Sequence, residues 1–331
     1  MIEHVLDLGN QLQKKLETST NFVIDSYKDL LIVGMGGSGV SGDVLKLVLN
    51  ETTQINVEVR KSYGIPEVIA ERRPKCLFIS YSGNTEETVE AVNDAIKYKL
   101  DWSVVSSGGQ LLELAIEHQR PFVKVPQGLQ PRAAFGLMTK AVLHYVSSDT
   151  DGEYLEMCNQ AGEYLNNAVE KQEENELLSQ AMQISKEISS KTSVIYGGTP
   201  LTYLAAQRWK TQINENAKSK AFVGYMPEVH HNEILSWEAN KEDSKNNYQL
   251  LFLRSPKENS QISKRFEFTK ELIGDKVNIS EIKNISSKNI ISNLFHLTLI
   301  GDLVSVCIAK NLDIDPYDIT AIENLKKLLK E

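Results

Sequence analysis

Apolar runs alternate with helical patterns along the first half of the chain, and this alternation constrains the fold more than any other feature. The segment DLLIVGMGGSGVSGDVLKLVL at residues 29–49 predicts a strand, a glycine loop and a helix. Parallel strands need helical crossovers and are buried on both faces, so the pattern predicts a parallel sheet with helices on both sides, a doubly wound α/β domain. Further strands are predicted at residues 55–63, 76–80, 102–107 and 121–126.

The second half repeats this pattern after a stretch at residues 153–190 that predicts helices. TSVIYGGTPLTYLAAQRWKTQI at residues 192–213 again predicts a strand, a glycine turn and a helix, and a long apolar helix is predicted nearer the C-terminus. Two further strands are predicted, at residues 248–255 and 276–282.

The length of 331 residues suits two domains of ordinary size. We predict two tandem doubly wound domains, one at residues 1–150 and one at residues 151–331. The periodicity of the N-terminal segment also predicts an amphipathic helix at about residues 2–18.

Charge and composition exclude several classes of function. The net charge is −8 with no dense stripe of Lys or Arg, which argues against a nucleic-acid partner. The N-terminus lacks the basic start and apolar centre of a signal peptide, and no run of eighteen apolar residues occurs, so we expect a cytoplasmic protein without a membrane partner. Cys76, Cys158 and Cys307 are too far apart to predict a zinc site or a disulfide framework.

The glycine loop at Gly34–Gly39 has three possible readings. It matches GxGxxG, and Glu58 follows at the distance of the acid that holds a ribose in dinucleotide sites. Its free backbone amides and helix N-terminus also suit a small anion, and Ser38 and Ser41 add hydroxyl donors. A tight turn without a ligand is the third reading.

A second polar segment, SYSGNTEET at residues 80–88, follows a buried strand. Ser80 and Ser82 lie at the strand's carboxyl end, where open α/β sheets bind ligands, and Thr85 lies where the next helix begins. Three hydroxyls and nearby amides at one point favour a phosphate group. The alternative is that Asn84 or Thr85 only caps the helix, with Glu87 completing a capping box from Asn84.

These two loops resemble those of sugar isomerase (SIS) domains, which bind phosphosugars. The segment QINENAKSKAFVGYMPEVHHNEILSWE at residues 212–238 resembles the signature of bifunctional phosphoglucose/phosphomannose isomerases. The resemblance implies two flavodoxin-like SIS-type domains with a three-layer αβα arrangement. It also implies interconversion of glucose 6-phosphate, and of mannose 6-phosphate, with fructose 6-phosphate through a cis-enediol, without a metal or cofactor.

The resemblance also assigns residue roles. Glu215 corresponds to the base that moves a proton between C1 and C2, and His231 to the group that opens the sugar ring. Arg132 corresponds to the arginine facing the enediolate, and Lys326, with Lys327 as the alternative, to a lysine of a closing helix. A homodimer in which His231 reaches across the interface is implied as well. The implied substrate and phosphate contacts are Gly37, Ser38, Ser80, Ser82, Thr85 and Arg132.

The chemistry agrees with these assignments. Isomerisation needs a positioned base and a group that stabilises the oxyanion, and a carboxylate and a guanidinium supply them. Without the motif, Glu215 would be interpreted as a solvent-exposed charge at a helix end and His231 as a structural histidine. Arg132 would be interpreted as a residue that stabilises its loop by pairing with a carboxylate. Two other functions stay open: a non-catalytic regulator that binds phosphosugars, and a dinucleotide-dependent oxidoreductase based on the glycine loop.

Overall fold

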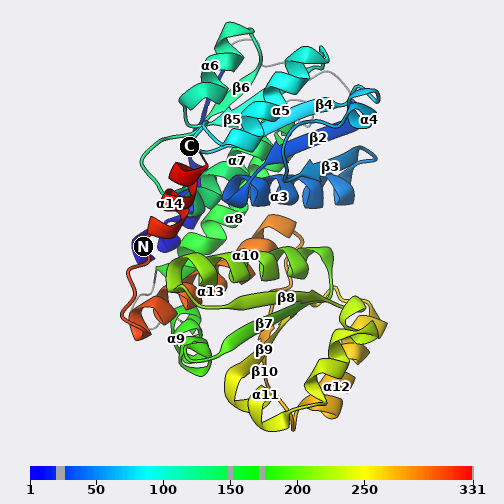
Figure 1. Ribbon diagram of the computed structural model, residues 1–331, viewed down its shortest axis with the longest axis vertical. Coiled ribbons are helices and arrows are strands. Elements are labelled where there is room, and N and C mark those ends of the chain that lie inside the picture. Colours follow the sequence, from blue (N-terminus) through cyan, green and yellow to red (C-terminus); the bar gives the residue numbers. More distant parts are fainter. Residues whose placement is uncertain (20–26, 148–151, 171–175, 330–331) are drawn as a thin grey trace. The chain divides into compact units, whose positions relative to one another are not determined.

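The computed structural model describes residues 1–19, 27–147, 152–170 and 176–329, which form two compact units (Figure 1). The N-terminal unit comprises residues 7–167 with 289–292. The C-terminal unit comprises residues 1–6, 168–288 and 293–331. The predicted boundary between residues 150 and 151 lies outside the described residues.

The N-terminal unit contains a six-stranded sheet in the order β1-β6-β5-β4-β2-β3. All neighbouring strands are parallel except β1, which pairs antiparallel with β6. The five parallel strands match the five predicted ones. The strands are β1 (Glu17–Thr18), β2 (Asp29–Gly34), β3 (Asn56–Arg60), β4 (Lys75–Ser80), β5 (Trp102–Ser106) and β6 (Phe122–Lys124).

Helices cover both faces of this sheet. Alternate strand residues such as Leu31, Phe78 and Val104 are fully buried in a core with the helices α4, α5 and α6. The residues between them, such as Ile32 and Ile79, are equally buried, because α3 and α7 cover the other face. The helices are α2 (Leu8–Gln13), α3 (Gly36–Thr52), α4 (Glu67–Ala70), α5 (Glu86–Lys97), α6 (Gly109–Glu117), η1 (Pro131–Ala134), α7 (Phe135–Val146) and α8 (Glu153–Val169).

The single helix predicted at residues 2–18 is wrong. The segment forms α1 (Ile2–Leu6) and α2, with a break at Asp7, and Glu17 and Thr18 belong to a strand. Edge pairing decides the outcome at residues 17–18. Glu17 pairs with Lys124 of β6 both in the strand register and through a 3.1 Å ion pair, and these contacts outweigh the local helical pattern.

The C-terminal unit repeats the topology with four parallel strands in the order β10-β9-β7-β8. This order equals β5-β4-β2-β3 of the first sheet, which agrees with the predicted repetition of the pattern. The strand at 221–225 was not predicted, because it lies within the motif segment. The strands are β7 (Thr192–Gly197), β8 (Ala221–Tyr225), β9 (Tyr248–Arg254) and β10 (Asn278–Lys283).

Two long helices, α10 and α13, pack against each other in this unit. Trp209 of α10 is fully buried and donates a hydrogen bond to the Leu297 carbonyl of α13 (2.7 Å). By length and composition α13 would suit a membrane span, but 94% of its apolar window is buried within the fold. The helices are α9 (Glu176–Ile188), α10 (Pro200–Ala217), η3 (Glu228–His231), η4 (Glu233–Trp237), α11 (Lys241–Asn247), α12 (Ser260–Ile273), α13 (Ile290–Asn311) and α14 (Thr320–Leu328).

Both units therefore have helices on the two faces of a parallel sheet, and the predicted three-layer α/β fold is confirmed. The three cysteines are buried. Burial raises the pKa of the Cys76 and Cys158 thiols to about 12, so both stay protonated as small apolar side chains.

Candidate active site

The glycine loop and the Ser-rich loop lie side by side at the edge of the first sheet. β2 and β4 are neighbours in the sheet although β3 lies between them in sequence, and Gly34 pairs with Ile79 at their carboxyl ends. The loop after β2 leads into α3, and the loop after β4 leads into α5. This is the point where strand order reverses, which is where open α/β sheets bind ligands.

A hydrogen bond joins the two loops directly. The Ser38 hydroxyl, at the start of α3, accepts a hydrogen bond from the Tyr81 amide (3.0 Å). Gly37 faces η1: a Cβ at this position would lie 3.2 Å from the Pro131 carbonyl oxygen. Glycine here lets η1 approach the loop, so the backbone of Arg132, whose side chain is buried, lies close to the loop.

The Ser-rich loop is organised by its own hydroxyl groups. The Ser80 hydroxyl is fully buried, accepts a hydrogen bond from the Gly83 amide (3.1 Å) and shares another with Thr85 (2.8 Å). Ser82 is exposed. When Ser80 donates to Thr85, the Thr85 hydroxyl proton is left for a bound anion. Ser80 thus shapes the loop, while Ser82 and Thr85 are the accessible hydroxyl groups.

The capping alternative for this loop is wrong. Thr85 is the N-cap residue of α5, yet its side chain makes no capping hydrogen bond. The Asn84 side-chain oxygen accepts from the Gln110 amide of α6 instead (3.0 Å). The first amides of α5 therefore have no side-chain cap, and the same is true of α3, whose N-cap residue is Met35.

Tyr81 and the serines at the end of β5 are structural parts of this site that the sequence analysis left out. The Tyr81 hydroxyl donates to the Pro126 carbonyl and accepts from the Leu129 amide, each at 3.0 Å, and so ties the segment before Arg132 to the loop. Ser107 donates to the Tyr81 carbonyl (2.6 Å). Ser106 ends β5 as Ser80 ends β4, and this shared serine at the end of a buried strand was a usable signal.

Glu58 does not occupy the position of a ribose-binding acid. It lies in the middle of β3 and pairs with Leu31 of β2, not with the residues at the strand's end. Its carboxylate accepts a hydrogen bond from the Arg72 guanidinium (2.6 Å). The dinucleotide reading thus loses the acidic residue on which it depended.

In the C-terminal unit, Glu215 lies in the last turn of α10 and is partly buried. The residues that follow it in the motif hold this turn in place. The Asn216 side-chain amide donates to the Ser305 hydroxyl of α13 (2.9 Å), and the Lys218 ammonium donates to the carbonyls of Glu215 and Asp315 (2.9 Å each). Lys218 adopts a left-handed conformation that ends the helix.

A buried ion pair further fixes α10. Arg208 of α10 and Asp302 of α13 approach to 2.5 Å and are almost completely buried. Burial raises the pKa of Asp302, and the nearby Arg208 charge opposes this rise. The two helices thus form a rigid support for Glu215, and neither Asp302 nor Ser305 was singled out in the sequence.

The two adjacent histidines of the motif have different surroundings. His231, at the end of η3, is exposed. His230 is half-buried: one ring nitrogen lies 3.0 Å from the Arg265 guanidinium and the other 2.7 Å from the Thr269 hydroxyl of α12. Burial, followed by the charge of Arg265, lowers the pKa of His230. A neutral His230 that accepts from Arg265 therefore anchors η3.

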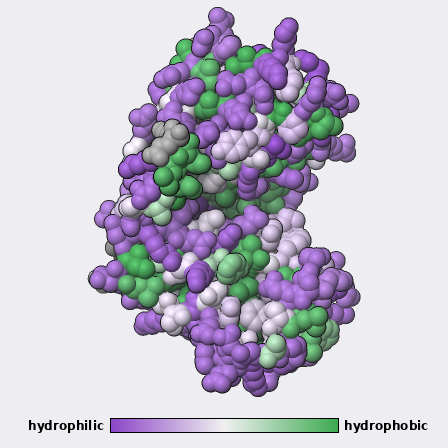
Figure 2. Space-filling model, viewed as in Figure 1, coloured by the Kyte–Doolittle hydropathy of each residue, from purple (hydrophilic) through white to green (hydrophobic). Residues whose placement is uncertain are grey.

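Lys326 and Lys327 both lie on α14, where every residue from 321 to 328 is exposed. Burial thus does not distinguish the two candidate lysines. The helix is amphipathic, and Figure 2 shows hydrophobic surface over this segment. Its exposed apolar side chains, with that of the residue that follows it, are Ile322, Leu325, Leu328 and Leu329.

The comparisons with known proteins agree with this architecture. Residues 24–99 match the SIS domain model, and residues 178–329 match the model described as the bacterial phospho-glucose isomerase C-terminal SIS domain. A solved structure of a hypothetical protein from Thermus thermophilus superposes with a TM-score of 0.72 at 14% identity, over 99% of this chain and 89% of that one. The chain is thus an SIS-domain protein.

Curated relatives define the family. The bifunctional phosphoglucose/phosphomannose isomerase of Aquifex aeolicus is 32% identical over 92% of this chain and 91% of its own length. Its counterpart in Thermoplasma acidophilum is 31% identical over 98% of both chains. D-glucosamine-6-phosphate 4-epimerase of Sulfolobus acidocaldarius is 29% identical over 92% of this chain and 90% of its own length. The chain belongs to the bifunctional phosphoglucose/phosphomannose isomerase family and is an isomerase.

Proposed function

We propose that this enzyme interconverts glucose 6-phosphate and mannose 6-phosphate with fructose 6-phosphate by proton transfer through a cis-enediol. A base removes the proton at C2 of the open-chain aldose while O1 takes up a proton, which leaves a C1–C2 double bond. Return of a proton to C1, with loss of the proton on O2, completes the ketose. Glucose and mannose 6-phosphate differ only at C2, and the enediol is planar there, so one site can serve both sugars.

The observation that carries this proposal is the way the motif holds Glu215. Its helix turn is fixed by the Asn216–Ser305 hydrogen bond and by Lys218, while the side chain stays partly exposed. A general base must be held in place and still reach substrate, and this arrangement meets both needs. We assign Glu215 as the base.

The phosphate contacts are assigned to the loops of the first sheet. Ser82, Thr85 and Ser38 supply hydroxyl groups, and the uncapped amides of α3 and α5 supply further donors. Gly37 allows close backbone approach, and Ser80 orients Thr85. Arg132 stabilises the enediolate, because a guanidinium is a cation whose planar N–H groups can donate hydrogen bonds to the developing oxyanion.

His231 opens the sugar ring in this proposal, and Lys326 approaches from the C-terminal helix. The exposure of His231 suits a role in which it reaches the site of a second copy of the chain in a homodimer. No metal or cofactor takes part in the proposed reaction, because a carboxylate base and a guanidinium supply the proton transfer and the oxyanion stabilisation. The enzyme acts in the cytoplasm.

The main test measures fructose 6-phosphate formation from each aldose phosphate in the presence of EDTA. Glu215→Gln should reduce kcat by about 10²–10⁴-fold, the usual contribution of a general base, with little change in stability. Glu242→Gln, an exposed carboxylate of the same unit, is the matched control and should keep full activity. Wild-type protein that binds both sugars without converting them would contradict the proposal and support the non-catalytic regulator.

A mixing experiment tests the homodimer. Glu215→Gln and His231→Asn should each be nearly inactive alone. If His231 acts across the interface, a mixed dimer has one intact site. Random mixing of equal amounts then restores about a quarter of wild-type activity, because half the dimers are mixed and each has one working site of two. Absence of restoration in dimers shown to exchange subunits would contradict the donation of His231 across the interface.

The similarity to the 4-epimerase defines a second candidate. That relative covers most of this chain at 29% identity. Incubation with D-glucosamine 6-phosphate, followed by NMR of the sugar protons, distinguishes the two. Inversion at C4 of D-glucosamine 6-phosphate would favour epimerisation. Glucose 6-phosphate that carries deuterium at C2 provides the second measurement, because release of this deuterium to water supports the proposed isomerisation.

A further inference from the structure

The second sheet has its own point of strand-order reversal, between β7 and β9. The loop after β9 spans Ser255–Asn259 and corresponds in strand order to the Ser-rich loop after β4. The glycine turn Gly197–Gly198 corresponds to the loop after β2. If the second sheet worked like the first, a ligand would bind here.

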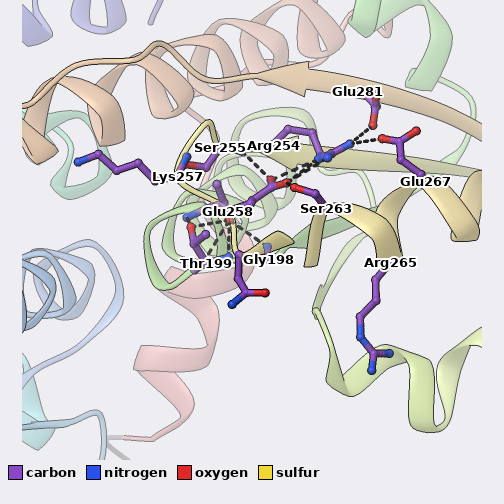
Figure 3. Close-up of polar contacts among 12 residues, drawn as sticks. Gly198, Thr199, Arg254, Ser255, Lys257, Glu258, Ser263, Arg265, Glu267 and Glu281 are labelled. Atoms are coloured by element: carbon purple, nitrogen blue, oxygen red, sulfur yellow. Dashed lines mark hydrogen bonds and ion pairs between the residues drawn. The ribbon is translucent and has the colours of Figure 1, made fainter. Parts of the chain in front are cut away.

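A side-chain carboxylate occupies this loop. Figure 3 shows Glu258 between Arg254 and Ser263. Its oxygens accept hydrogen bonds from the Ser255 amide (2.7 Å), the Arg254 guanidinium (3.0 and 3.2 Å) and the Ser263 hydroxyl (3.0 Å). The Glu258 side chain is only 2% exposed. A backbone amide, a hydroxyl and a guanidinium are the donors that phosphate oxygens also take.

The N-termini of the helices that follow β7 and β9 are capped by side chains. The Thr199 side chain accepts from the Thr202 amide and forms a capping box at α10. The Asn259 side chain accepts from the Gln261 amide at α12. The matching helices of the first sheet, α3 and α5, have no side-chain cap.

The charges near the loop are balanced. A cavity of about 510 Å³ opens beside it, lined by three cationic and three acidic side chains. Arg254 contacts Glu267 (2.9 Å) and Glu281 (2.5 Å) in addition to Glu258. A phosphate dianion entering this cavity would meet the carboxylates of Glu258, Glu267 and Glu281. The six charged lining residues are Arg254, Lys270, Lys283, Glu258, Glu267 and Glu281.

We propose that the Glu258 carboxylate occupies the position that a bound phosphate would take at the second sheet, and that it thereby prevents phosphosugars from binding there. Each chain then binds sugar phosphate only at the first sheet, and truncation of the Glu258 side chain creates an anion site. The comparison with a phosphate loop in the first sheet rests on the proposed function. The occupation of the second loop by Glu258 does not.

The experiment compares thermal unfolding of the full-length wild type, Glu258→Ala, Glu258→Gln and Glu267→Ala in potassium phosphate and in potassium chloride of equal ionic strength. Phosphate should raise the Tm of Glu258→Ala above the wild-type shift by about 4 °C at roughly ten times its dissociation constant. Glu258→Gln keeps the loop filled, and Glu267→Ala removes an exposed partner of Arg254. Both should show only the wild-type shift.

Equal phosphate shifts in Glu258→Ala and wild type would overturn the proposal. If Glu258→Ala does not fold in chloride, its refolding is measured in phosphate instead. Recovery of the folded protein in phosphate supports the proposal. Failure of Glu258→Ala to fold in both salts, while Glu258→Gln folds, overturns it. The wild-type shift reports phosphate at the first sheet alone. Its absence would therefore count against the proposed function while leaving the assignment of Glu258 intact.

Discussion

The two sheets of this isomerase have the same strand order but differ at the point where that order reverses. In the N-terminal unit, α3 and α5 begin without side-chain caps, and exposed or half-buried hydroxyls lie beside them. In the C-terminal unit, Thr199 and Asn259 cap the corresponding helices, and Glu258 fills the loop. Topology thus provides the place for a ligand, and a few loop side chains decide whether the place stays open.

The difference also separates two kinds of contribution. The N-terminal unit uses backbone amides, glycines and hydroxyls, which suit anion binding. The C-terminal unit holds Glu215 at the end of a helix fixed by buried polar contacts with α13. Four predictions test this division, in order of decreasing effect.

The largest effect is expected for the buried ion pair of the C-terminal unit. Asp302→Asn leaves the Arg208 charge buried without its carboxylate, so unfolding should become easier by about 3–5 kcal/mol. Urea denaturation measures this change. Asp275→Asn, which breaks an exposed pair with Lys241, is the control and should leave the midpoint unchanged. Similar midpoints for both variants would show that the pair does not support α10.

The second-largest effect is expected from acid, which should destabilise the C-terminal unit. Burial lowers the pKa of His296 on α13 to about 4, whereas the unfolded chain binds this proton below about pH 6.5. The stabilisation is complete above pH 6.5 and is lost as the pH falls toward 4, by up to about 3 kcal/mol.

Denaturation monitored by Trp209 and Trp237 in a Trp102→Phe background measures the acid effect, since both reporters lie in the C-terminal unit. His296→Gln should flatten the profile between pH 4 and 6.5. An equally steep profile in that variant would assign the acid sensitivity to another group.

In the N-terminal unit, Gly83 is the most sensitive position for binding. It has a φ of +71°, and a Cβ would lie 1.7 Å from the Gly108 carbonyl oxygen. Gly83→Ala should displace the loop and raise KM for the sugar phosphate about 100-fold. Gly152→Ala, at φ +85° with no atom within 4 Å of the added carbon, controls for backbone strain and should leave KM unchanged.

The smallest effects compare two threonines in corresponding helix starts. Thr85→Val removes a hydroxyl of the open loop and should raise KM about tenfold. Thr199→Val removes the capping box of α10 and should cost about 1 kcal/mol of stability without changing KM. Reversed outcomes would mean that the open and closed loops have been assigned to the wrong sheets.

Most of the architecture followed from hydrophobic patterning, because parallel strands buried on both faces are continuous apolar runs. The sequence-based predictions were wrong where contacts with residues distant in sequence determine the structure. Residues 17–18 form a strand because they pair with β6. Asn84 binds Gln110 instead of capping α5, and Glu58 binds Arg72. Each competing contact spans between 14 and 107 residues, which no local pattern describes.

The sequence by itself determined the fold class, the position of both loops and the motif that carries Glu215 and His231, because these depend on periodicity and on residue type. Only the tertiary structure decided that Ser80 shapes its loop, that Asn216 and Asp302 hold α10, and that Glu258 fills the second loop. Those roles depend on which hydrogen-bond donor lies next to which acceptor, and only the folded structure brings these groups together.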